Sequence, residues 1–151
     1  MSVFLVDTNV LVYAHDPRDR RKQDLAREVM ARVVSGRTGV LSVQCLTEFY
    51  RTVRFRLPEP LDPAAALAQV ERFADAFLVL DLTPIVVLEG CRASGTYGLS
   101  IWDALIWAAA RLNQVPYILT EDTQHERVLE GVRYLNPFVP QFEPGILAAR
   151  R

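Results

Sequence analysis

The segment VFLVDTNVLVYA (residues 3–14) decides how the chain begins to fold, because an acidic residue interrupts an apolar run. The run Val3–Val6 is apolar and begins and ends with a β-branched residue, which predicts a short buried strand. Asp7 follows at once, then two small polar residues, and a second apolar run begins. A charge beside a buried strand is costly unless it is paired, hydrated or bound to a metal. Asp7 therefore either caps a helix or takes part in chemistry.

The composition favours a single well-buried domain over the 151 residues. Half of the residues are hydrophobic, and the mean hydropathy of +0.10 argues against disorder. The net charge of −1 excludes a uniformly basic nucleic-acid-binding protein, so any such contact needs a local patch. Cys45 and Cys91 form no C-x-x-C pair and support neither a zinc knuckle nor a redox motif. Three prolines in residues 136–151 predict an extended C-terminal tail.

The sequence carries no pattern typical of export or membrane insertion. The apolar run at the N-terminus ends at Asp7 after four residues, which is too short for a secretory signal. The longest apolar run, Ala104–Ala110, is far shorter than the ~20 residues that span a bilayer. We therefore expect a soluble, cytoplasmic protein without a membrane partner.

Apolar segments of strand length alternate with segments of helical periodicity along the whole chain. After the first strand, strands are predicted at Val40–Leu41, Phe77–Leu80, Tyr117–Leu119 and Val132–Leu135. Helices are predicted at Asn9–His15, Arg20–Val34, Val43–Phe55, Pro63–Ala76, from Pro84 to a turn near Gly95–Gly98, at Ser100–Asn113 and at Thr123–Glu130. This alternation predicts an α/β fold with a mostly parallel five-stranded sheet and helices on both faces.

Four carboxylates lie close after predicted strands or at the start of helices. Asp7 follows the first strand, Glu48 lies on the helix after the second, Asp103 lies in the first turn of an apolar helix, and Asp122 follows the fourth strand. The carboxyl ends of parallel strands meet at one edge of a sheet, where ligands bind, so these acids can converge. Each also has a structural explanation, as a helix cap, a capping box with Ser100, or an exposed helix face.

Carboxylates that share a pocket need a counter-charge. Two of them ~4 Å apart repel by ~1 kcal/mol in water and by ~4 kcal/mol at a partly buried site. No lysine is near these positions in the sequence, and Arg51 and Arg54 lie a helical turn beyond Glu48. A divalent cation is the simplest counter-charge, and oxygen ligands favour Mg²⁺ or Mn²⁺, one or two per site, over Zn²⁺.

Four segments in this order resemble the PIN-domain family, and within it the VapC-like toxin subunits of VapBC-type toxin–antitoxin pairs. They are VDTNVLVYA, SVQCLTEFYR, LSIWDALIWAAA, and ILTEDTQH followed by GVRYLNPF, and they cover nearly the whole chain. The resemblance implies an α/β/α sandwich and a metal-dependent endoribonuclease. It assigns catalytic and metal-binding roles to Asp7, Glu48, Asp103 and Asp122, and supporting roles to Thr8, Asn9 and Thr120. Glu121 neighbours Asp122, so which of the two faces the metal is left open.

The same resemblance implies an RNA substrate, cleaved by metal-activated water to 5′-phosphate and 3′-hydroxyl ends. It further implies a cognate antitoxin and a homodimer. Two alternatives stay open: a PIN nuclease outside toxin–antitoxin systems, and an inert PIN-like protein that binds RNA or a partner. Phosphoacceptor folds also place an aspartate after the first strand. A phosphatase of that kind needs a second aspartate at position 9, which is Asn9 here, and a receiver needs a late lysine that the chain lacks.

Overall fold

The structure is a computed structural model that describes residues 2–148. In this part of the chain, one sheet contains the strands β1 (Phe4–Val6), β2 (Gly39–Ser42), β3 (Leu78–Leu80), β4 (Tyr117–Leu119), β5 (Val128–Leu129) and β6 (Val132–Leu135). The helices are α1 (Thr8–Tyr13), α2 (Arg20–Ser35), α3 (Val43–Phe55), α4 (Pro63–Ala76), α5 (Pro84–Tyr97) and α6 (Ile101–Leu112). A 3-10 helix, η1 (Pro144–Leu147), follows them.

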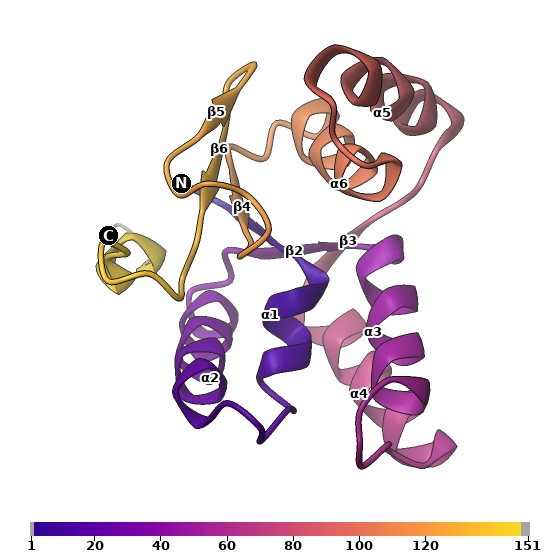
Figure 1. Cartoon of the computed structure of the whole chain (residues 1–151), viewed down its shortest axis with the longest axis vertical. Coiled ribbons are helices and arrows are strands. Elements are labelled where there is room, and N and C mark those ends of the chain that lie inside the picture. The colour runs from indigo at the N-terminus through magenta and orange to yellow at the C-terminus, as the bar shows by residue number, and fades with distance from the viewer. Residues whose placement is uncertain (1, 149–151) are drawn as a thin grey trace.

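The sheet has the order β3-β2-β1-β4-β6-β5. All neighbouring strands are parallel except β5, which pairs antiparallel with β6. Helices α1 to α4 cover one face, and α5 and α6 cover the other (Figure 1). The α/β/α sandwich is therefore confirmed, with six strands in place of the five predicted. Every residue of β1 is buried because this strand has neighbours on both sides and helices on both faces.

Local signals explain why the helices begin and end where they do. Asp62 and Thr83 accept hydrogen bonds from the backbone of the first turns of α4 and α5. Pro63 and Pro84 occupy the first helical positions, where a missing N–H costs nothing. Gly98, with a φ of 69°, ends α5 in the left-handed conformation that favours glycine. No helix in residues 2–148 combines the length and the apolar character that a membrane span requires.

The predicted helix at Thr123–Glu130 is wrong. Turns and bends lead here into β5, which forms a hairpin with β6. Glu130 and Gly131 connect the two strands with φ values of 46° and 88°, and Glu126 has a φ of 69°. A helix needs negative φ at every residue, whereas a two-residue hairpin connection commonly takes positive φ at both positions. The Glu-Gly pair was therefore a turn signal.

The predicted extended tail is also wrong for the residues that the structure describes. Residues 136–148 form turns and η1, and η1 contacts α2. Phe138, Phe142 and Leu147 are buried, so the tail packs against the rest of the fold instead of extending away from it. Residues 149–151 lie outside the described part of the chain. That the whole chain is one domain stays a prediction.

Candidate metal centre

The candidate site lies where the strand order reverses. The chain runs from β1 outward to β2 and β3, then returns to place β4 on the other side of β1. Val6 pairs with Leu119, so the residues that follow β1 and β4 leave the sheet side by side. Such a switch point, at the carboxyl ends of the strands, is where open α/β sheets bind ligands. Asp7 and Thr120 are the first residues beyond the two strands.

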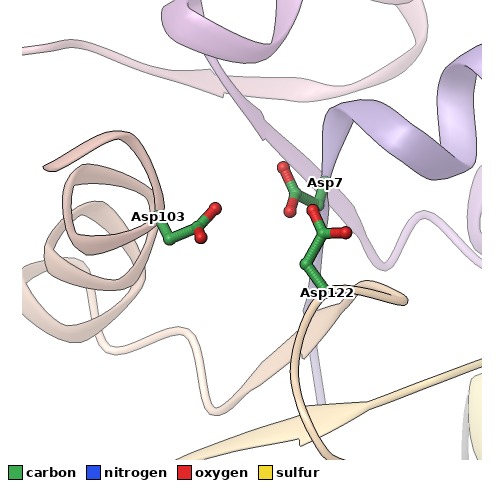
Figure 2. Close-up of side chains that lie close together, drawn as sticks. All are labelled: Asp7, Asp103 and Asp122. Atoms are coloured by element: carbon green, nitrogen blue, oxygen red, sulfur yellow. The ribbon is translucent and has the colours of Figure 1, made fainter. Parts of the chain in front are cut away.

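Three of the four predicted acids meet at this point. Asp7, Asp103 and Asp122 each offer a carboxylate oxygen, and these three atoms lie within 4.8 Å of one another. Figure 2 shows Asp103 pointing from α6 toward Asp7, at the end of β1, and Asp122, on the loop after β4. Asp7 is buried, with 7% of its surface exposed, Asp103 is half-buried and Asp122 is exposed. The cluster therefore reaches from the buried end of β1 to the surface.

The carboxylate of Asp7 is held at both oxygens. Oδ1 accepts a hydrogen bond from the backbone N–H of Thr8 at 2.8 Å, so Asp7 also caps α1. Oδ2 accepts one from the Thr120 hydroxyl at 2.9 Å. The Asn9 side-chain amide donates to Thr120 Oγ1 at 2.9 Å and to Asp122 Oδ2 at 3.1 Å. Asn9 and Thr120 thus connect Asp7 with Asp122, and Thr8 holds Asp7 through its backbone N–H.

Glu48 lies beside this cluster and is tied to it through other side chains. The Thr8 hydroxyl donates to Glu48 Oε2 at 2.9 Å, and the Gln44 amide donates to Oε1 at 3.1 Å. Within residues 2–148, Glu48 is not part of the group of ligand atoms within 4.8 Å. Its hydrogen bonds fit a residue that orients water or an outer ligand rather than one in direct contact with a cation.

Burial and mutual repulsion raise the pKa of two acids in the cluster. Desolvation raises the pKa of Asp7 to about 7, and the charges of Asp122 and Asp103 add to this, against hydrogen bonds from Thr8 and Thr120 that lower it. The pKa of Asp122 is also raised, first by partial desolvation of its carboxylate and then by the charges of Asp103, Glu121 and Glu48. The cluster is therefore short of positive charge, as a site for a cation would be.

Lys22 and Tyr13 decide which of the two neighbouring acids enters the cluster. Lys22 Nζ lies 2.8 Å from Glu121 Oε2, and the Tyr13 hydroxyl donates to Oε1. Both oxygens of Glu121 are thus engaged on the α1–α2 side, while Asp122 faces Asp7. The fold brings Lys22 to Glu121 across 99 positions, so this lysine neutralises an acid outside the cluster of three. No local sequence pattern identifies Lys22, Tyr13 or Gln44 as residues that contact the acids of the site.

The donor set fits a hard divalent cation. Its three carboxylates supply only oxygen, which suits Mg²⁺ and Mn²⁺, and Asp122 lies toward the solvent, where such ions keep several waters. The neighbouring sulfur, that of Cys45, is fully buried, and burial raises the pKa of this thiol to about 12. A thiol that stays protonated is no ligand for such an ion.

Comparison with known proteins assigns the family. The PIN domain profile matches residues 4–130, and the chain therefore belongs to the PIN domain family. No curated protein matches the sequence. Among solved structures, a toxin–antitoxin complex from Klebsiella pneumoniae is similar, with a TM-score of 0.60 and 15% identity over 88% of this chain and 96% of that chain.

Two further structures share the fold. Mycobacterium tuberculosis VapC20, a toxin that cleaves the sarcin-ricin loop, matches with a TM-score of 0.62 and 18% identity over 76% of this chain and 86% of its own. DNA-bound VapBC from Salmonella typhimurium matches with a TM-score of 0.63 and 16% identity over 89% of this chain and 97% of that chain. These low identities establish a common fold.

Proposed function

We propose that the protein is a metal-dependent endoribonuclease, and that it acts in the cytoplasm as the toxin of a type II toxin–antitoxin pair. The observation that carries the proposal is the convergence of Asp7, Asp103 and Asp122 at the switch point of a PIN fold. The likeness to VapC20 and to toxin–antitoxin complexes supports the RNA substrate and the antitoxin partner.

Each residue has a distinct task in this proposal. A divalent cation, Mg²⁺ or Mn²⁺, lowers the pKa of a bound water and polarises a phosphoryl oxygen. Asp7 and Asp103 are the central ligands and Asp122 completes the set, while Glu48 orients water. Thr8 and Thr120 hold the Asp7 carboxylate in one orientation, and Asn9 does so for Asp122. Attack by water in line with the 3′ oxygen leaves 5′-phosphate and 3′-hydroxyl ends.

An apolar surface supports the homodimer that belongs to the same proposal. Strand β3 lies at an edge of the sheet, and its Leu78 is 66% exposed. Ile85 and Leu88, at the start of the following helix, are exposed by 67% and 71%. An exposed apolar edge strand is a liability that contact with a second chain removes.

The proposal is tested by cleavage of total cellular RNA with the purified protein in Mg²⁺, in Mn²⁺ and in EDTA. We expect discrete fragments that require the metal, carry 5′-phosphates, and disappear in Asp7→Asn and Asp103→Asn. Asp75→Asn, an exposed acid on α4 far from the cluster in sequence, is the matched control and should cleave like wild type.

Two results separate the alternatives. A wild-type protein that binds RNA but cuts none, after removal of any copurified protein, would favour an inert PIN domain. Cleavage that the product of an adjacent small gene does not inhibit would favour a nuclease outside toxin–antitoxin systems.

A further inference from the structure

A groove of about 430 Å³ opens directly beside the acidic cluster. Thr8 and Glu48 form its inner end, and these two residues are hydrogen-bonded to each other at the cluster. Trp102, Arg51 and Arg56 line the rest, together with Thr47 and Thr52. The groove therefore borders the candidate metal centre through Thr8, whose backbone N–H donates to Asp7.

The tryptophan in this groove is exposed, and its backbone is held by a hydrogen bond. Trp102 is 63% exposed, whereas Trp107, the only other tryptophan, is fully buried. Trp102 lies in the first turn of α6, one residue before Asp103. Its backbone carbonyl accepts a hydrogen bond from Gln44 at 3.0 Å, and the same amide donates to Glu48. The backbone that carries the indole is thus held next to Asp103, a candidate ligand.

The two arginines have charges that no neighbouring acid neutralises. Within residues 2–148, neither Arg51 nor Arg56 forms an ion pair with a carboxylate. Both are exposed on the C-terminal half of α3 or just beyond it. The one acid in the groove, Glu48, already has both oxygens engaged by Thr8 and Gln44. The groove therefore presents two free cations and an aromatic face.

We propose that this groove binds an unpaired nucleotide of the RNA adjacent to the scissile phosphate, with its base stacked on Trp102 and neighbouring phosphates held by Arg51 and Arg56. The inference rests on the proposed nuclease function and names the residues that would contact an unpaired segment of the RNA. In a duplex the bases stack on one another, so their faces cannot reach the indole, whereas unpaired bases stack readily on aromatic side chains. Guanidinium groups suit the phosphates between such bases.

The test measures binding separately from cleavage. In the Asp103→Asn background with Mg²⁺, the affinity for a labelled single-stranded RNA oligonucleotide is followed by fluorescence anisotropy, and a gel checks that the RNA stays intact. Trp102→Ala should raise Kd by roughly 5- to 150-fold, the range typical of one stacked base. Trp102→Phe should keep the affinity within a few-fold. Val34→Ala, which alters another exposed apolar residue, on α2, should leave Kd unchanged.

Three further readouts identify the contacts. RNA should quench tryptophan fluorescence, and Trp102→Ala should abolish the quenching because Trp107 is buried. Arg51→Gln and Arg56→Gln should each reduce the slope of log affinity against log salt by about 0.7, the value for one phosphate contact with a single strand. Arg72→Gln, on α4, should leave the slope unchanged. The same RNA annealed to its complement should bind more weakly than the single strand and lose its dependence on Trp102.

Several outcomes would overturn the inference. The first is an unchanged Kd in Trp102→Ala, and the second is equal affinity for duplex and single-stranded RNA. The third is a wild-type dimer that dissociates in Trp102→Ala during sedimentation, because this face would then be a contact between protein chains. RNA cut by the Asp103→Asn parent would contradict the proposed metal centre but leave the binding result standing. If Trp102→Ala loses RNA binding while the wild type cleaves no RNA, the groove is supported as an RNA-binding site and the proposed nuclease activity is contradicted.

Discussion

The ammonium group of Lys22 lies 2.8 Å from Oε2 of Glu121, and it also lies 4.7 Å from the centroid of the Tyr13 ring. The chain's only lysine therefore binds the acid that stays outside the candidate metal centre. Tyr13 engages the other oxygen of Glu121, so the backbone after β4 is held with Asp122 toward Asp7. Two consecutive acids have different tasks because one of them is neutralised locally.

This relationship predicts that substitutions of Glu121 and Asp122 have unequal effects on RNA cleavage. Glu121→Gln should keep RNA cleavage within about 3-fold of wild type, because the amide oxygen can still accept a hydrogen bond from Lys22. Asp122→Asn should lower cleavage by at least about 10-fold, because a charged ligand is lost. Initial rates at a fixed Mg²⁺ concentration measure both. Comparable losses in the two variants would mean that Glu121 also serves the metal.

The pKa of Asp7 predicts an unusual dependence of stability on pH in the metal-free protein. This pKa is about 7 in the folded chain, against 3.8 for a free aspartate. Between these values the folded state binds more protons than the unfolded state, so the free energy of unfolding falls as pH rises. The stability due to protonated Asp7 is complete below about pH 4 and is lost as pH passes 7, by roughly 4 kcal/mol. The raised pKa of Asp122 acts in the same direction.

Urea unfolding in EDTA at pH 5 and pH 8 measures this effect. Wild type should lose stability between the two values, and Asp7→Asn should show a clearly smaller loss because its side chain does not titrate. Saturating Mn²⁺ at pH 8 should restore stability to wild type by favouring ionised Asp7. An identical pH dependence in wild type and Asp7→Asn would show that Asp7 is not the titrating group.

The close packing around Gly39 predicts that an added side chain at this position lowers stability without directly changing the candidate site. A Cβ at this position in β2 would lie 2.4 Å from Cε1 of Phe77 and 3.2 Å from Cγ2 of Val33. Gly39→Ala should therefore destabilise the protein by about 1 to 3 kcal/mol, because the core must shift. Gly95→Ala, on α5 with open space around its Cβ, should instead stabilise by about 0.5 to 1 kcal/mol. Thermal unfolding compares the two, and equal effects would contradict the packing described for Phe77.

Local sequence signals predict most of the helices and strands. They fail where tertiary contacts determine the local structure or the position of a side chain. The bounds of α3, α4 and β4 agree with the prediction, because caps, prolines and apolar runs mark them. The predicted convergence of acids was sound for Asp7, Asp103 and Asp122, since parallel strands bring their carboxyl ends to one edge. Glu48 lies beside them instead, because Thr8 and Gln44 hold both of its oxygens.

Other features leave no trace in local periodicity. Strand β5 has two residues, too few for an alternating pattern, so the charged run before it predicts a helix that does not form. The buried tail depends on Phe138, Phe142 and Leu147 finding a surface elsewhere in the fold. The contacts of Lys22 with Glu121 and of Gln44 with Trp102 join distant segments, and only the folded chain places them together.

Titration of Mn²⁺ into the metal-free protein at pH 7.5, followed by calorimetry, tests the central claim most directly. The claim is that Asp7 and Asp103 hold a divalent cation. Saturable binding in wild type and in the control Asp75→Asn, competed by Mg²⁺ and weakened at least about 10-fold in Asp7→Asn and Asp103→Asn, is the predicted result. Binding of equal strength in all four proteins, or no binding in wild type, would contradict it.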